Sequence, residues 1–211
     1  MQGQPAHPAA RPGRAGRAGG DAVGLRHRAQ PGGRAVTVLP TTAGEFRLRP
    51  VEPADLPLLA DWMNDPAVAA FWELDGPPQR TALHVRKELD AGNALYLGEL
   101  GGVPMSYWEV YRVEHDRLAG YYPAQPGDMG LHLLLGPASH RGRGLGAVLL
   151  AAVAEDLLRG APRVVAEPDV RNTASIRAFR RAGFAAVSEI DLPEKRAALM
   201  VRERARPQGT V

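Results

Sequence analysis

Hydrophobic residues recur with a helical period in four segments of the chain. Leu56, Leu59 and Trp62 are spaced as on one face of a helix, which Pro53 opens and residues 64–66 end. Further helices are expected around residues 80–91, after a glycine-rich turn at 139–146, and over 172–182. The helix after the glycine-rich turn has an apolar face made of Leu145, Val148, Leu149, Ala152, Val153 and Leu157.

Shorter apolar runs predict the strands. Residues 46–51, 131–135 and 163–166 form such runs, and residues 94–100 and 103–113 flank Gly101-Gly102, which indicates a hairpin. Two closing strands are expected at 184–190 and 197–201, whereas residues 118–127 are typical of a loop. The order β-α-α-β-β-β-α-β-α-β-β predicts a single mixed α/β domain over residues 44–205.

The two ends of the chain differ from this domain. Residues 1–35 contain eight Gly, four Pro and six Arg against one Asp, with little apolar surface. We therefore predict a disordered tail over residues 1–43, rich in Arg, Gly, Pro and Ala, and a flexible C-terminus at 206–211. A nucleic-acid-binding arm is a disfavoured alternative, because no aromatic residues alternate with these arginines.

Composition excludes several classes of protein. The 211 residues are 45% hydrophobic, which is enough to bury one large core. The chain has no cysteine, which excludes disulfide scaffolds, thiolate metal sites and cysteine nucleophiles. No apolar run reaches the ~18 residues of a membrane span, and no signal-peptide core is evident. We expect a soluble cytoplasmic protein with no membrane partner and no metal.

The most specific chemical signal is the sequence Arg-Gly-Arg-Gly-Leu-Gly at 141–146, between an apolar strand and an amphipathic helix. Such a turn exposes backbone N–H groups beside a helix N-terminus and can bind a pyrophosphate. It is not a Walker loop, because no Gly-Lys-Ser/Thr follows, and its late position argues against a dinucleotide-binding fold. The candidate phosphate-binding residues are Arg141, Gly142, Arg143, Gly144, Leu145 and Gly146.

Two motifs together resemble the GNAT acyltransferase superfamily. The first is Arg141-x-x-Gly144-x-Gly146 after a strand, and the second runs from Asn172 through Phe179 to Gly183-Phe184. This resemblance implies a central, mostly antiparallel sheet with flanking helices, splayed at the acyl-CoA site. It also implies acyl-CoA as co-substrate, with the pyrophosphate on the 141–146 amides. The backbone along Leu133, Leu134 and Leu135, together with Asn172 and Phe179, would lie along the rest of that site.

Three further segments resemble the siderophore-biosynthesis branch of this superfamily: residues 107–111, 128–136 and 167–172. That branch includes hydroxylysine and hydroxydiamine acyltransferases and mycobactin-type lysine N-acyltransferases. The resemblance implies N-acylation of an amine derived from lysine, ornithine or a diamine, and N-hydroxylation of that amine is favoured. The donor would be acetyl-CoA or succinyl-CoA, or an acyl carrier protein.

His132 interrupts an apolar strand and shares one strand face with Leu134. A core histidine is the plain interpretation, but the strand precedes the phosphate turn, and the resemblance places the branch's catalytic histidine here. We expect His132 to act as general base or proton relay. Asp169 would orient the amine or share the proton transfer, with helix capping as the alternative. Phe179 occupies a position where relatives carry a tyrosine acid, and phenylalanine has no proton to give.

Four residues are expected to contact the amine substrate: Trp72, Trp108, Glu109 and Tyr111. Glu109 would bind a cationic end and the aromatic rings would pack along the methylene chain, although an aromatic strand in the core is an equal alternative.

Other functions remain open on sequence grounds. An aminoglycoside 6′-N-acetyltransferase would need several acids facing the cleft, for which Glu109, Glu114, Asp116 and Asp128 are candidates. A protein N-terminal or ribosomal-protein acetyltransferase, or a non-catalytic CoA- or RNA-binding protein, is disfavoured.

Overall fold

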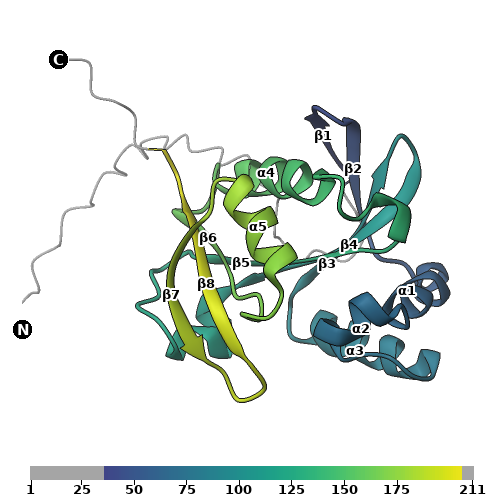
Figure 1. Ribbon diagram of the computed structural model, residues 1–211, viewed down its shortest axis with the longest axis horizontal. Helices are drawn as coiled ribbons and strands as arrows, with labels where there is room; N and C mark the ends of the chain where they lie inside the picture. The colour runs from purple at the N-terminus through teal and green to yellow at the C-terminus, as the bar shows by residue number, and fades with distance from the viewer. Residues whose placement is uncertain (1–35, 206–211) are drawn as a thin grey trace, which may run out of the picture.

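A single eight-stranded sheet organises residues 36–205, the part of the chain that this computed structural model describes (Figure 1). The strand order is β1-β2-β3-β4-β5-β6-β8-β7, and every neighbouring pair is antiparallel except β5 and β6. The strands are β1 (Thr37–Thr41), β2 (Gly44–Pro50), β3 (Ala94–Leu100), β4 (Val103–Arg112), β5 (Met129–Leu135), β6 (Arg163–Ala166), β7 (Ala185–Asp191) and β8 (Arg196–Glu203). The predicted mixed α/β fold is confirmed.

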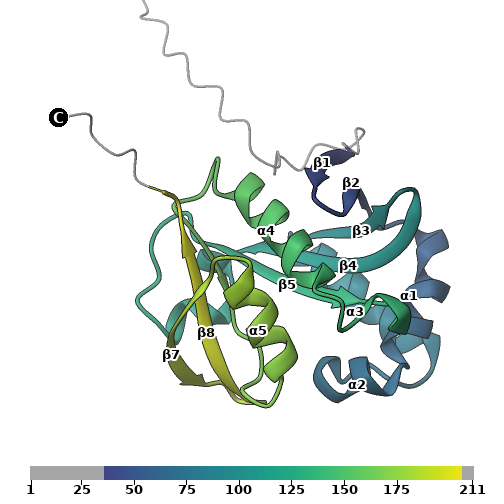
Figure 2. The ribbon, with the colours of Figure 1, turned by 45° about the horizontal axis from the view of Figure 1, so that its top comes forward.

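Helices cover both faces of the sheet (Figures 1 and 2). On one face lie α4 (Leu145–Leu157) and α5 (Thr173–Arg181), and on the other lie α1 (Leu56–Met63), α2 (Pro66–Trp72) and α3 (Pro78–Asp90). Leu131 of β5 and Leu149 of α4 are fully buried in the core between the sheet and this pair of helices. Each such leucine stabilises the fold by about 1.5–3 kcal/mol.

Two elements differ from the sequence prediction. The expected disordered tail was wrong for residues 37–43, because β1 pairs with β2 and buries Leu39 in the core. The rest of that prediction, over residues 1–35, and the flexible C-terminus at 206–211 lie outside the described residues. Helix α2 was also missed. It is short, and it begins because the Asp65 side chain accepts a hydrogen bond from the Ala67 N–H, with Pro66 at the first helical position.

The sheet is split between its two parallel strands. Only Met129↔Val164 and Gly130↔Val165 pair across β5 and β6, although β5 continues along β4 to Leu135. Strands β6, β8 and β7 turn steeply away from β3–β5 in Figure 1. Beyond Gly130, the edge of β5 that faces β6 pairs with no strand in the described part of the chain. This opening is the expected splay.

Candidate active site

A polar cluster lies on the α1–α3 face of the sheet, beside the split. The β4–β5 register places Glu109 directly opposite His132. Alternation along β4 brings Tyr107 and Tyr111 to the same face as Glu109. Tyr107 belongs to the apolar cluster around α1 and α3, and Tyr111 to a second apolar cluster over β6, β7 and β8. The polar cluster therefore occupies the boundary between two hydrophobic regions.

Two carboxylates bind the two ring nitrogens of His132. Nδ1 lies 3.0 Å from Oε2 of Glu109, and Nε2 lies 2.7 Å from Oε1 of Glu167. When both carboxylates are ionised they can only accept hydrogen bonds, so each ring nitrogen then donates and the ring is an imidazolium. Burial alone would lower the pKa of His132, but the charges and hydrogen bonds of the two glutamates outweigh it and raise the pKa to about 10.

The same contacts hold both glutamates in the charged form. Glu109 and Glu167 are only 4% and 5% exposed, and burial by itself would raise the pKa of each. Interaction with His132 reverses that effect and lowers the pKa of each to about 2, with help from His84 for Glu109 and from Lys195 for Glu167. Glu109, His132 and Glu167 thus form a charged triplet in which both glutamates are buried.

Glu109 also contacts His84 on helix α3 and Tyr107 on its own strand. His84 of α3 places Nε2 2.6 Å from Oε1 of Glu109, and the Tyr107 hydroxyl donates to the same oxygen at 3.0 Å. Sequence reasoning missed His84, although a usable signal exists. His84 directly precedes Val85, which is buried on the inward face of α3, and a histidine beside that face is a candidate for a buried polar contact.

The carboxylate beside His132 comes from Glu167 and not from Asp169. Asp169 accepts hydrogen bonds from the backbone N–H and the guanidinium of Arg171, at 2.6–3.0 Å. In residues 36–205 no hydrogen bond or ion pair joins Asp169 to His132. Glu167 follows β6 directly at the point where β6 leaves β5, and sequence reasoning passed over it.

The aromatic residues expected to contact substrate fall into two groups. The Trp72 ring lies edge-on to His132 at 6.3 Å and to His84 at 6.5 Å, so it borders the polar cluster. The Tyr111 hydroxyl donates to Glu167 at 3.1 Å and lies 3.5 Å from Nε2 of His132. Trp108 is different: it is fully buried on the opposite face, against Phe46. Its assignment to the substrate site is corrected, since it belongs to the core.

The glycine-rich turn has the geometry of an anion cradle. Gly142 and Gly144 have φ of +73° and +80°, a left-handed conformation that favours glycine, and a Cβ at either would meet nothing within 4 Å. Gly144 is the N-cap of α4 and makes no side-chain cap, so N–H groups at this helix start remain available to a ligand. Leu145 and Gly146 form the first turn of α4, where Gly146 packs close to Leu135.

The two arginines of the turn have different environments. Arg141 donates to both oxygens of Asp65, one at 2.9 Å, and to the Gly136 carbonyl at 2.7 Å, so it ties the turn to the start of α2. Arg143 is exposed, and its one hydrogen bond in the described chain is to the Ser139 carbonyl. Arg143 is therefore the freer cation for a phosphate.

The remaining residues that were predicted to bind the cofactor either line the split with their backbone or stabilise the fold around it. Leu133 and Leu135 pack on the α4–α5 side and Leu134 on the other, which leaves the β5 backbone edge toward β6. Asn172 caps α5 by accepting from the Ser175 N–H at 3.0 Å. Phe179 is 4% exposed and packs edge-to-face on Phe184, so its ring acts in the core.

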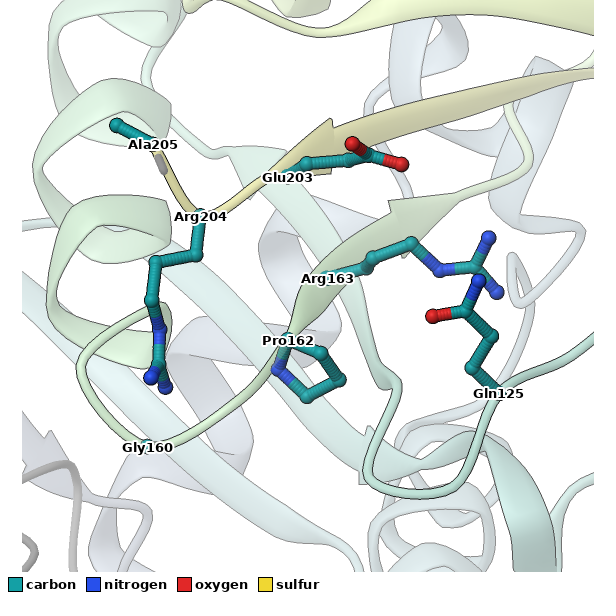
Figure 3. Close-up of a pocket in the computed structure, with 7 residues that line it drawn as sticks. All are labelled: Gln125, Gly160, Pro162, Arg163, Glu203, Arg204 and Ala205. Atoms are coloured by element: carbon teal, nitrogen blue, oxygen red, sulfur yellow. The ribbon is translucent and has the colours of Figure 1, made fainter. Parts of the chain in front are cut away.

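A cavity of 530 Å³ lies elsewhere, between the start of β6 and the end of β8, as Figure 3 shows. Its charged residues already serve the fold. Arg204 donates to backbone carbonyls at and after the C-terminus of α4, and Arg163 is paired with the buried Asp128. No residue of the polar cluster or of the glycine-rich turn lines this cavity.

Residues 36–205 contain neither a candidate metal site nor a candidate membrane span. No group of three or more His, Cys, Asp and Glu side chains there could hold a metal ion. No helix in the same residues is long and apolar enough to cross a membrane.

Known proteins with sequences similar to this chain include three acyltransferases. Lysine N-acyltransferase MbtK of Mycolicibacterium paratuberculosis is 36% identical over 158 residues, covering 73% of this chain and 72% of that protein. N(6)-hydroxylysine O-acetyltransferase of Escherichia coli is 35% identical, covering 68% and 47%. N-hydroxyputrescine acetyltransferase of Acinetobacter baumannii is 34% identical, covering 70% and 72%.

Solved structures share the fold. An uncharacterized protein from Bacillus halodurans superimposes with a TM-score of 0.75 at 36% identity, covering 80% of this chain and 90% of that one. Aminoglycoside acetyltransferase AAC(6′)-Ib in complex with coenzyme A gives a TM-score of 0.68 at 26% identity, covering 81% and 95%. The acetyltransferase (GNAT) domain family model matches residues 52–192. This chain is therefore a GNAT acyltransferase, related to lysine N-acyltransferase MbtK and to hydroxylysine and hydroxyputrescine acetyltransferases.

Proposed function

We propose that this enzyme transfers an acyl group from acyl-CoA to the nitrogen of an N-hydroxylated amine derived from lysine, ornithine or a diamine, in hydroxamate siderophore biosynthesis. The observation that carries the proposal is the position of His132 between Glu109 and Glu167, whose contacts raise its pKa and favour the imidazolium. A lysine amine has a pKa near 10.4 and arrives as an ammonium. A protonated His132 cannot remove that proton. A hydroxylamine is far less basic, arrives neutral and can attack without prior deprotonation.

The acyl-CoA would span the split between β5 and β6. Its pyrophosphate would bind the N–H groups around Gly144 and the exposed Arg143, and its thioester would lie along the free edge of β5. A backbone N–H of residues 133–135 would polarise the carbonyl. His132 is reached from this edge, because it lies on β5 and its side chain is 33% exposed.

Glu167 and His132 have separate roles in the proton transfers of the proposed reaction. As the nitrogen–carbon bond forms and the carbon–sulfur bond breaks, Glu167 takes the proton from the attacking nitrogen and the His132 imidazolium protonates the departing thiolate. The proton on Glu167 then returns to His132 across their 2.7 Å contact. This scheme supplies the acid that Phe179 cannot provide, and it needs no covalent acyl-enzyme.

The test is CoA release from acetyl-CoA and succinyl-CoA, each with N6-hydroxylysine, N5-hydroxyornithine, N-hydroxycadaverine, lysine or kanamycin. Turnover with a hydroxylated amine that is at least tenfold faster than with lysine supports the proposal. Faster turnover with lysine would contradict a hydroxylated acceptor. If neither CoA donor gives turnover, an acyl carrier protein is the next donor to test. His132→Gln should lower kcat by roughly 10² to 10⁴, while His115→Gln, at an exposed histidine, serves as the control.

An aminoglycoside acetyltransferase is the second candidate, favoured by the fold shared with AAC(6′)-Ib. Of the four acids that such a site would use, only Glu109 lies in the polar cluster. Glu114 pairs with Arg112, Asp116 caps a short 3₁₀ helix, and Asp128 is buried against Arg163. Turnover with kanamycin alone would reverse the preference.

A further inference from the structure

Lys195 brings a positive charge to the candidate active site from the hairpin between β7 and β8. Its Nζ lies 3.7 Å from Oε1 of Glu167, the oxygen that also contacts Nε2 of His132. Its charge also helps to lower the pKa of Asp169, after the larger effect of Arg171. The Glu167 carboxylate thus lies between Lys195 and the His132 imidazole, on the side where β6 diverges from β5.

The ammonium of Lys195 has N–H donors available for a ligand. In residues 36–205 its one ion-pair partner is Glu167, and the 3.7 Å separation is too long for a hydrogen bond. Glu167 is already engaged by His132 and Tyr111. Arg171, the other cation near this edge, is already ion-paired with Asp169 through two hydrogen bonds. Lys195 is therefore the cation with donors free for an anionic ligand group.

The hairpin holds Lys195 in place. Leu192 and Lys195 exchange backbone hydrogen bonds at 2.9 and 3.3 Å, and Leu192 is buried in the apolar cluster over β6–β8. Glu194, the preceding residue, is ion-paired with Arg117 in the loop between β4 and β5. A cation on a tied turn loses little further freedom when it binds a ligand, which favours its use in recognition.

We propose that Lys195 binds the α-carboxylate of the acceptor, so that the enzyme selects N-hydroxylated amino acids over N-hydroxylated diamines. This inference rests on the proposed function and narrows its substrate class. With the reacting nitrogen at His132, the far end of a carboxylate-bearing acceptor would be attracted to Lys195. The ammonium end of a diamine would be repelled by the same charge.

The test compares two acceptors that differ only in the carboxylate. N6-hydroxylysine and N-hydroxycadaverine are assayed with acetyl-CoA, which carries no donor carboxylate of its own. The wild type should prefer N6-hydroxylysine by about tenfold or more in kcat/KM, the size expected of one charge-assisted contact. Lys195→Met and Lys195→Gln should bring the ratio close to one, and Lys195→Arg should restore most of it.

Arg196→Met is the matched control, because the neighbouring Arg196 is exposed and pairs with Glu189 on β7. It should leave the substrate ratio unchanged. If Lys195→Met lowers kcat/KM equally for both acceptors, Lys195 acts only through Glu167 and the inference is overturned. A wild-type enzyme that uses both acceptors equally overturns it too, but leaves the proposed function standing. Turnover with kanamycin and with neither acceptor would overturn both.

Discussion

The ring of Tyr111 lies directly over Gly130, its register partner on β5, and leaves no room for a side chain there. A Cβ at Gly130 would lie 2.0 Å from the ring, well inside contact distance. This close approach brings the Tyr111 hydroxyl to Glu167 at 3.1 Å and the ring to within 5.2 Å of His132. The missing side chain of one glycine thus allows the tyrosine to reach the charged triplet.

Gly130→Ala should therefore impair both stability and activity. Displacing the buried ring of Tyr111 is expected to cost about 1–3 kcal/mol in the free energy of unfolding, measured in urea. Loss of the hydroxyl contact to Glu167 should also lower kcat in the CoA-release assay. Gly120→Ala is the control, because a Cβ at Gly120 would meet nothing within 4 Å. Equal stability of the two variants would contradict the close contact.

The charge on His132 predicts how activity depends on pH. Because the pKa of His132 is raised to about 10, kcat/KM should show no ionisation near 6.5 and should fall only as the pH approaches 10. Glu109→Gln removes one of the two carboxylates, so this alkaline limb should move to lower pH. A limb that rises with pH near 6.5 would indicate a neutral histidine base and contradict the imidazolium.

The same group predicts how stability depends on pH. The folded-state pKa of His132 is above its unfolded value near 6.5, so its contribution is fully present below that pH and is lost as the pH rises toward 10. The folded-state pKa values of Glu109 and Glu167 are depressed, so their contribution is present above about 4.3 and is lost as the pH falls toward 2. Urea unfolding from pH 6 to 10 should show the wild type losing its advantage over His132→Gln. A constant difference across this range would rule out the raised pKa.

The glycine-rich turn gives a prediction about donor binding. Gly144→Ala forces an L-residue into φ of +80°, which costs about 1–2 kcal/mol. We expect the KM for acetyl-CoA to rise while the KM for the amine stays within twofold, as measured by varying each substrate in turn. Gly160→Ala, outside the turn and without a positive φ, should change neither constant. Unchanged donor KM in folded Gly144→Ala would remove this turn from donor binding.

Local sequence patterns determined much of the scaffold. Period-two alternation placed His132 on the opposite face of its strand from Leu131 and Leu133, as observed. The Gly101-Gly102 hairpin and the glycine-rich start of α4 were likewise predictable. These features depend on backbone preferences and burial within one or two elements, which neighbouring residues along the chain encode.

Only the tertiary structure decided which groups meet at His132. Glu167 and Asp169 both follow β6, and nothing local distinguishes them, but the divergence of β6 from β5 brings Glu167 to the imidazole and leaves Asp169 with Arg171. His84 reaches Glu109 because α3 packs on that face of the sheet. Contacts of this kind join residues far apart in the chain, so they depend on strand order, splay and helix packing, which no short sequence window contains.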